Sequence, residues 1–381
     1  MTKYLLGLIS LCLMCSCSDT APGETPPIDP PTPTPTVTIT KPEFVFGFQG
    51  QSKYSYCPSA LKQADGTVHL YFCGNPENLI MVDNIFHIKI NPDGTQTAAK
   101  SVLQPGVPGS WDDHHTCDPS VIEGNFTWKN TTYKYAMFFL SNMYGVYYNE
   151  IGVAFSNDLD ADSWVKYPQQ IVKKTWSSEG DQEIGGSGKS WGVGQPSVVS
   201  LDGKGKLLLT YTVGDIGGTR IVWTEADFSN MDTYSISTPQ TIVQTGLKAI
   251  DNQSRDYTCN SEFAIDKDAD KIVMIRPVQP MPNDYPNYLN SSLEIDYMNL
   301  SDFTNQRGNW TPIYRITPDD TGYPRNHNAT LLRDNFGHLQ DWEEPEFYFT
   351  VSKAAPDVQP SGSSHAEWTY HIWKSKVVKS K

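Results

Sequence analysis

The residues best suited to chemistry gather in one short stretch, Trp111–Ile122. It reads Trp-Asp-Asp-His-His-Thr-Cys-Asp-Pro-Ser-Val-Ile, so three carboxylates and two imidazoles precede an apolar run. Carboxylates and imidazoles are the side chains that most often move protons in enzymes. They also bind metals, but a metal site needs more ligands than the sequence assigns here. We therefore expect proton transfer or ligand binding and predict no cofactor, and a central structural ion such as calcium is left as an open alternative.

Similar residues elsewhere could complete this site. We expect Asp118, Glu262 and His115 to be the catalytic groups. We expect the ligand to be bound by Trp111, Asp113, His114, Tyr148, Glu150, Trp191, Gln195, Arg220, Arg255, Arg325 and His327.

Each of these residues also has a structural interpretation. Asp118 could cap the turn before Pro119, and Glu262 could form a salt bridge with Arg255 or Arg325. One of the two adjacent histidines could be a hydrogen-bonded structural group. The aromatic residues could pack within the fold instead of stacking on a ligand.

The elements that must position these residues form a repeat. Five segments begin alike, at intervals of roughly 60–80 residues. They are Cys57-Pro58-Ser59-Ala60-Leu61, Asp118-Pro119-Ser120-Val121-Ile122, Gln195-Pro196-Ser197-Val198-Val199, Ser261-Glu262-Phe263-Ala264-Ile265 and Asn328-Ala329-Thr330-Leu331-Leu332. In this alignment Glu262 stands at the position of the prolines. Each repeat holds about four short strands, which is typical of propeller blades.

Composition agrees with an all-β fold. The 381 residues include 28 glycines and 27 prolines, and no long helical periodicity is present. We predict a five-bladed β-propeller with four-stranded antiparallel blades, in which residues 43–48 supply the outer strand of blade five and close the ring. In blade two we expect strands at 119–123, 133–140 and 151–156, with a turn at 124–131. The net charge of −14 and the lack of a basic stripe argue against nucleic acid as a partner.

The antiparallel order of the strands sorts the loops onto two faces. Short turns such as Asp65-Gly66 lie on one face. The loops that hold Trp111–Cys117, Asn142–Glu150 and Gly322–His327 lie on the other face. Long loops on a rigid scaffold usually carry the functional site, so we place the site on this second face.

The N-terminus has the character of a targeting segment. Lys3 precedes a short apolar run that ends at Met14, and Cys17 follows Ser16 as in a bacterial lipoprotein cleavage site. An ordinary secretory signal is the alternative. We predict a signal peptide at 1–17, a Pro/Thr-rich linker at 18–42 and the propeller at 43–381. The expected protein is a monomer in the bacterial cell envelope that meets the membrane only through a lipid anchor.

Four cysteines follow the signal region: Cys57, Cys73, Cys117 and Cys259. An exported protein permits disulfides. Cys57 and Cys73 flank a predicted hairpin and could face each other, while free buried thiols are the equal alternative.

Several motifs resemble the five-bladed propeller glycoside hydrolases, with family 43 arabinofuranosidases and xylosidases and the levansucrase/invertase group as the nearest pattern. The resemblance rests on Asp118-Pro119-Ser120-Val121-Ile122, the aromatic strand after it, and residues 151–159 with Trp164. It implies a base from blade one, a pKa-tuning Asp from blade two and a Glu acid from blade three. Asp118 matches the second role, but blade one has Cys57 and blade three has Gln195 at the expected positions.

Two functions remain from these observations. The first is a glycoside hydrolase that acts on a poly- or oligosaccharide through carboxylates in the central funnel. The second is a glycan-binding lipoprotein without catalysis on the same scaffold, which the two missing carboxylates favour. The gathering of histidines and carboxylates on one face favours the enzyme. In either case the expected partner is a carbohydrate.

Overall fold

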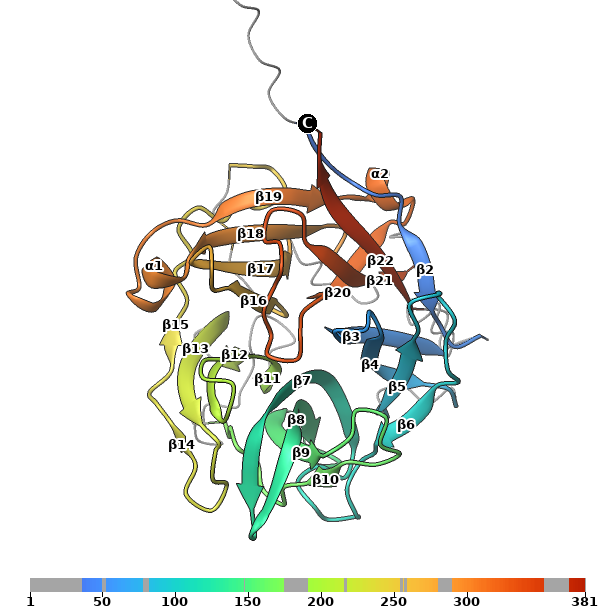
Figure 1. Cartoon of the computed structure of the whole chain (residues 1–381), viewed down its shortest axis with the longest axis vertical. Coiled ribbons are helices and arrows are strands. Elements are labelled where there is room, and N and C mark those ends of the chain that lie inside the picture. Colours follow the sequence, from blue (N-terminus) through green and yellow to red (C-terminus); the bar gives the residue numbers. More distant parts are fainter. Residues whose placement is uncertain are drawn as a thin grey trace, which may run out of the picture. The chain divides into compact units, whose positions relative to one another are not determined.

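The computed structural model arranges five antiparallel sheets around a central axis (Figure 1). It describes residues 36–49, 53–77, 82–146, 148–174, 191–215, 218–253, 256, 259–279, 290–352 and 370–380. The prediction of an all-β protein with five four-stranded blades is confirmed.

Each blade is built from strands that follow one another in the chain. Blade one holds β3 (Tyr54–Lys62), β4 (Val68–Asn75), β5 (Asn84–Ile90) and β6 (Lys100–Leu103). Blade two holds β7 (His115–Trp128), β8 (Thr131–Asn142), β9 (Glu150–Ser156) and β10 (Val165–Lys166). Blade three holds β11 (Gly192–Ser200), β12 (Lys206–Asp215), β13 (Gly218–Asp227), β14 (Ser235–Ile236) and β15 (Gln240–Thr241). Blade four holds β16 (Glu262–Asp266), β17 (Lys271–Pro277), β18 (Leu293–Asn299) and β19 (Thr311–Ile316). Blade five holds β20 (Arg325–Leu331), β21 (Glu346–Ser352) and β22 (Tyr370–Lys379).

The N-terminal strands lie on the outer edge of blade five. Both β1 (Val37–Ile39) and β2 (Glu43–Phe46) pair with β22. The compact unit begins at Thr36, ahead of the expected boundary at residue 43. That these strands hold the ring closed stays a prediction.

The first strand of each blade lies next to the axis, and a hydroxyl or carboxyl group joins it to the following blade. Ser59, Ser120 and Ser197 accept hydrogen bonds from the backbone N–H groups of Val121, Val198 and Phe263, at 3.0 to 3.4 Å. Each acceptor sits two residues after the bulge at its strand start. Glu262 has this role in blade four and accepts from Leu331 N–H at 2.8 Å.

The connection between β20 and β21 crosses the centre of the ring (Figure 1). Its backbone bonds to all four other blades: Arg333 to Ala60 and Lys62, Asn335 to Glu123, Phe336 to Ser200, and Gly337 to Ile265. All of these partners lie toward the far ends of the inner strands. The segment 333–339 therefore blocks the central channel on the face of the short turns, where several of its residues also line a pocket of about 570 Å³.

The expected turn at 124–131 in blade two is wrong. Residues up to Trp128 continue strand β7, with a bulge between Glu123 and Phe126, and Phe126 is fully buried. The chain reverses only at Lys129 and Asn130, both with positive φ. Two such residues suit the tight hairpin turns that match strand twist. Gly124 lies in this bulge. Its interpretation as a turn residue placed the reversal of the chain direction several residues before its actual position.

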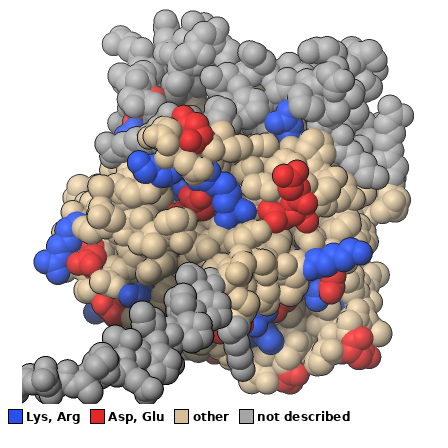
Figure 2. All heavy atoms as spheres, turned by 90° about the horizontal axis from the view of Figure 1, so that it is seen from above, with Lys and Arg blue, Asp and Glu red and all other residues tan. Residues whose placement is uncertain are grey.

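Two short helices, α1 (Leu300–Thr304) and α2 (Pro318–Thr321), join strands in blades four and five. Within the described ranges, no helix has the length and apolar character needed to span a bilayer. In Figure 2 acidic and basic side chains lie interspersed over the face in view.

Candidate functional site

A polar cavity lies where the five inner strands begin, on the face of the long loops. Its volume is about 40 Å³. Its lining residues are Cys57, Pro58, Asp118, Pro119, Gln195, Pro196, Asn260, Ser261, Glu262, Asn328 and Ala329. Each blade contributes the start of one strand, so the cavity follows from the repeat itself. Asp118 and Asn328, which directly follow the loops 111–117 and 322–327 expected on this face, both line the cavity.

Five of these residues occupy equivalent positions and share an unusual backbone conformation. Cys57, Asp118, Gln195, Asn260 and Asn328 have φ between 39° and 54°. In blades one, two, three and five, this residue and the next one oppose a single partner across the ladder, which is a β-bulge. Left-handed backbone at a non-glycine residue costs free energy, and its repetition at all five strand starts marks a functional ring. We call these five residues the cavity ring.

The cavity ring corrects the alignment of blade four. Asn260, not Ser261, is the equivalent of Asp118. Glu262 therefore aligns with Ser120, and the sequence alignment of blade four with the other blades was wrong by one residue. Blade four has no proline at this point, which removed the marker present in the first three blades.

A chain of hydrogen bonds runs round one side of the cavity ring. The Asn260 amide donates to Asn328 Oδ1, and the Asn328 amide donates to Cys57 Sγ. The Cys57 thiol in turn donates to the Asp118 carboxylate. Three side chains therefore orient Asp118 from blades four, five and one.

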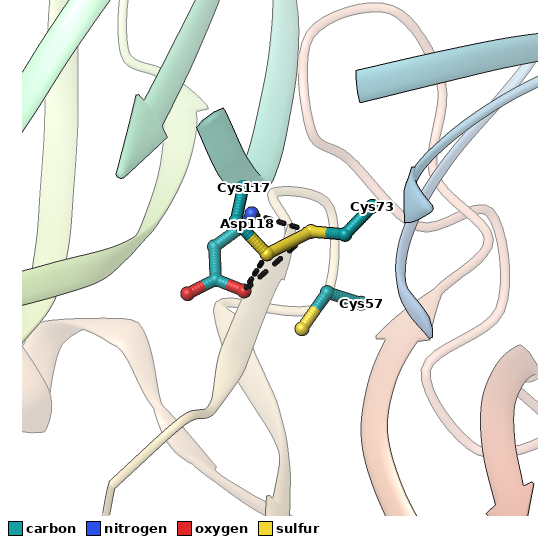
Figure 3. A group of neighbouring side chains, drawn as sticks. All are labelled: Cys57, Cys73, Cys117 and Asp118. Carbon is teal, nitrogen blue, oxygen red and sulfur yellow. Dashed lines mark hydrogen bonds between the residues drawn. A yellow bond between two sulfur atoms is a disulfide. The ribbon is translucent and has the colours of Figure 1, made fainter. Parts of the chain in front are cut away.

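Asp118 lies between the Cys57 thiol and a disulfide between Cys73 and Cys117 (Figure 3). The disulfide joins β4 of blade one to β7 of blade two, and the Asp118 N–H donates to Cys73 Sγ at 2.8 Å. The proposed Cys57–Cys73 pairing is wrong because Cys117 of the next blade is the partner. Cys57 and Cys259 are both buried.

The pKa of Asp118 is raised from 3.8 to about 6. Burial is the main cause, because it penalises the charged carboxylate. The Cys57 hydrogen bond and the nearby His115 oppose this shift, while the charge of Asp83 adds to it. Asp118 therefore keeps its proton in mildly acidic solution, as a proton donor requires.

A second carboxylate, Asp83, lies behind the cavity wall. It comes from the connection between β4 and β5 and is only 1% exposed. It accepts hydrogen bonds from the hydroxyls of Tyr54 at 2.5 Å and Tyr56 at 2.8 Å. His115 Nδ1 lies 3.9 Å from Asp83 Oδ2, the oxygen that accepts from Tyr56, and His115 Nε2 lies 3.4 Å from Asn149 Oδ1. His115 thus lies within electrostatic reach of both Asp83 and Asp118.

Three buried polar atoms around the cavity have no hydrogen-bond partner among the described residues. They are Gln195 Oε1, His115 Nδ1 and His327 Nδ1. Burial lowers the pKa of His327 to about 3, so its imidazole is neutral, and its Nε2 lies 3.4 Å from the Asn260 amide. Buried polar groups in native proteins are nearly always paired, so unpaired ones at a cavity indicate a polar ligand.

Glu262 lines the cavity, but its carboxylate is engaged. One oxygen accepts from Leu331 N–H, and the other lies 2.7 Å from Arg333. Burial raises the pKa of Glu262, and the Arg333 guanidinium opposes that shift. Glu262 therefore does form a salt bridge, with Arg333 as its partner among the described residues; Arg255 lies outside them. These contacts give Glu262 a role in joining blades four and five.

The rim of the cavity on blade two holds Asp113, His114 and Trp111. Asp113 accepts from Tyr144 N–H and Gly109 N–H, each at 2.6 Å. His114 lies edge-on to Tyr144 with ring centroids 5.5 Å apart. Trp111 stacks on Phe139 and packs on blade two, so its ring is part of the scaffold.

The other predicted binding residues lie farther from the cavity ring. Glu150 accepts from Gln170 at 2.6 Å, and Arg220 forms a bidentate pair with Asp215 at 2.7 Å. The Lys174 ammonium lies 3.6 Å from the centre of the Tyr148 ring. Trp191 N–H donates to Thr219 at 3.5 Å. Arg325 begins β20 and is 8% exposed, and Arg255 lies outside the described residues.

Metal ligands would have to come from two clusters among the described residues. At the cavity, Asp118 is accompanied by sulfurs, two of which are bonded to each other and cannot bind as thiolates while the disulfide stands. Between blades one and two, His69 Nδ1 and His87 Nε2 lie 3.0 Å apart in rings only 11° from parallel. That geometry is a histidine–histidine hydrogen bond, and Lys89 already pairs with the nearby Asp160.

The sequence did not identify four residues that belong to this region: Asp83, Tyr56, Asn260 and Asn328. The positive φ of Asn260 and Asn328 is compatible with asparagine, which adopts this conformation more readily than most residues. The available signal was an Asn three residues before Phe263 and before Leu331, where the apolar runs begin. Asp83 gave none, because its partners Tyr54 and Tyr56 meet it only in the folded blade.

No protein-family model and no curated protein matches the sequence. Solved structures do resemble the fold. A family 117 glycoside hydrolase from the marine bacterium Zobellia galactanivorans has a TM-score of 0.56 at 11% identity, over 90% of both chains. An α-L-arabinofuranosidase from Podospora anserina, solved with cellotriose, has a TM-score of 0.51 at 10% identity, over 88% of this chain and 95% of that one.

Another structure with this likeness has a different activity. An N-acetylgalactosamine deacetylase from F. plautii, solved with a blood group B trisaccharide, has a TM-score of 0.56 at 12% identity, over 90% and 95% of the two chains. At such low identity these likenesses establish the fold alone. The structural neighbours of this chain thus include glycoside hydrolases of families 117 and 62 on five-bladed β-propellers.

Proposed function

We propose that the protein is a glycoside hydrolase that cleaves a poly- or oligosaccharide in the propeller cavity. One observation carries the proposal: Asp118, with a pKa of about 6, lines a polar cavity and lies within electrostatic reach of His115. A protonated carboxyl group beside a second proton-transfer group is what glycosidic bond cleavage requires.

The proposed roles follow from the contacts. Asp118 donates its proton to the glycosidic oxygen as the bond to the sugar carbon breaks. His115, whose Nδ1 lies 3.9 Å from the Asp83 carboxylate, takes a proton from the water that attacks that carbon. Asp83 is a positioning residue, because it is buried behind Tyr54 and Tyr56. The unpaired atoms of Gln195 and His327 suit sugar hydroxyls.

A glycan-release assay tests the proposal. The panel should include arabinan, arabinoxylan, xylan and cello-oligosaccharides, since arabinofuranosidases are among the structural neighbours. Asp118→Asn should lower the rate by about 100-fold or more. Asp162→Asn is the matched control, because Asp162 pairs with Lys100 on an exposed surface. Equal rates for wild type and Asp118→Asn would sink the proposal.

Glycan binding without catalysis is the second candidate, and the composition of the cavity ring favours it. Three of the five positions are amides, Gln195, Asn260 and Asn328, and amides bind hydroxyls without transferring protons. This candidate expects oligosaccharide binding by calorimetry with no released product. Product release that depends on Asp118 would exclude it.

We also propose that the protein is anchored in the cell envelope by lipid on Cys17, a residue outside the described part. The support is the short apolar run ending at Met14 and the Ser16-Cys17 sequence. Cys17→Ser should move the protein from the membrane fraction to the soluble fraction. An unchanged distribution would overturn the anchor.

A further inference from the structure

Large apolar side chains are exposed on the two loops that Asp113 joins. The large hydrophobic residues that are most exposed among those described are Val107 and Tyr144, each at 76%, and Met143 adjoins Tyr144 at 38%. Isolated exposed apolar residues need no explanation, but a group beside a polar cavity often marks a binding surface. We call Val107, Met143 and Tyr144 the rim patch.

Asp113 holds the rim patch in place. Its two carboxylate oxygens accept the N–H groups of Gly109 and Tyr144, each at 2.6 Å. Gly109 belongs to the loop of Val107, where Ser110 N–H bonds to the Val107 carbonyl, and Tyr144 belongs to the loop after β8. One carboxylate thus ties two loops together although each presents apolar side chains to water. These backbone hydrogen bonds lower the pKa of Asp113, so the carboxylate stays charged.

The rim patch continues into the cavity through two imidazoles. The Tyr144 ring centroid lies 5.5 Å from that of His114, and the His114 centroid lies 5.6 Å from that of His115. His115 in turn interacts with Asp118. Aromatic and imidazole rings therefore line a path from the exposed rim to the carboxyl group proposed to react.

We propose that the rim patch is a binding subsite for a second sugar unit, with the Tyr144 ring packed on the C–H face of that sugar. The inference rests on the proposed function and adds to it: the ligand is a chain of two or more sugars, not a lone monosaccharide. A tyrosine offers a flat apolar face at low cost in side-chain entropy, and sugar rings present matching C–H surfaces. Asp113 is a positioning residue for that ring.

The experiment compares substrates of increasing length. In the wild type, kcat/KM should rise from an aryl monosaccharide glycoside to the disaccharide and trisaccharide of the same sugar. Tyr144→Ala should remove about three- to tenfold of that rise and leave the aryl glycoside unaffected. Tyr144→Phe keeps the ring and should match the wild type. Val165→Ala, which removes an apolar side chain that is 46% exposed on β10, should change nothing.

Calorimetric titration with the same oligosaccharides separates this inference from the proposed catalysis. If no substrate is cleaved, the hydrolase proposal fails, and the subsite is still supported when Tyr144→Ala weakens oligosaccharide binding by a similar factor. A length dependence that survives in Tyr144→Ala overturns the subsite, as does equal binding by wild type and variant. A wild type that binds none of the oligosaccharides overturns it as well.

Discussion

Cys73 and Cys117 form a disulfide between β4, the second strand of blade one, and β7, the inner strand of blade two. Cys117 immediately precedes Asp118 in the sequence. The same Cys73 sulfur accepts the Asp118 N–H. The covalent link thus fixes the backbone on which the proposed proton donor stands. It joins two blades that also meet through the ion pairs Lys89–Asp160 and Lys100–Asp162 and through hydrogen bonds such as Val121 N–H to Ser59.

Removal of this disulfide should weaken both the fold and the site. For Cys73→Ser/Cys117→Ser we expect the free energy of unfolding to fall by about 2–4 kcal/mol, because the bond closes a loop with a sequence separation of 44. Denaturant unfolding measures this change. Reductant should destabilise the wild type and leave the double variant unaffected. A wild type that unfolds identically with and without reductant would contradict the structural role.

The pKa of Asp118 predicts a pH dependence of both activity and stability. As a proton donor, Asp118 loses its proton as the pH rises through about 6, so the rate should fall on that side. The free energy of unfolding should also fall as the pH rises. The folded state holds this proton between 3.8 and about 6, so the contribution of Asp118 to stability is lost as the pH rises through that window.

Asp118→Asn isolates this effect. At pH 7 to 8 it should raise the free energy of unfolding by about 1–3 kcal/mol, because it removes a buried charge, and the gain should vanish below the unfolded pKa. Thermal unfolding at several pH values measures it. A variant that is less stable than wild type at pH 8 would show that the charged carboxylate is stabilised by its surroundings.

We expect a strong energetic coupling between Glu262 and Arg333, which form a buried salt bridge. Glu262→Ser restores the hydroxyl found in blades one to three but leaves the fully buried Arg333 without its carboxylate. We expect a loss of about 3–5 kcal/mol, since an unpaired buried charge is costly. Glu262→Ser/Arg333→Met should lose less than the single variant. Additive losses in this double-mutant cycle would refute the coupling.

The fold could be predicted because its information is local and repeated. The same strand start appears as Pro119-Ser120-Val121 and as Pro196-Ser197-Val198. The spacing between such segments predicts the length of a blade in residues. Asp118 was found for the same reason. Asn260 was misaligned because Ser261 replaces the proline that marks the bulge. The repeat therefore predicts the scaffold wherever the marker survives.

The rest of the site depends on contacts between blades, which the sequence does not display. Asp83 meets His115 from another blade, and Glu262 meets Arg333 of the channel-blocking segment. The partner of Cys73 is likewise decided by the distance between blades and not by the nearer cysteine along the chain. These pairings arise only when the ring has formed.

Gln195, whose side-chain oxygen Oε1 is buried at the cavity, should contribute more to ligand binding than to the stability of the fold. Because this oxygen has no partner among the described residues, Gln195→Met should change the free energy of unfolding by less than about 1 kcal/mol. Oligosaccharide affinity should fall by about three- to tenfold, the worth of one hydrogen bond. Gln63→Met is the contrasting control, because Gln63 exchanges two hydrogen bonds with Asn335 away from the cavity. That variant should lose stability and keep its affinity, and calorimetry with thermal unfolding reads both quantities. If Gln195→Met proved the less stable of the two and bound sugar as the wild type does, Gln195 would be a structural residue of the cavity ring.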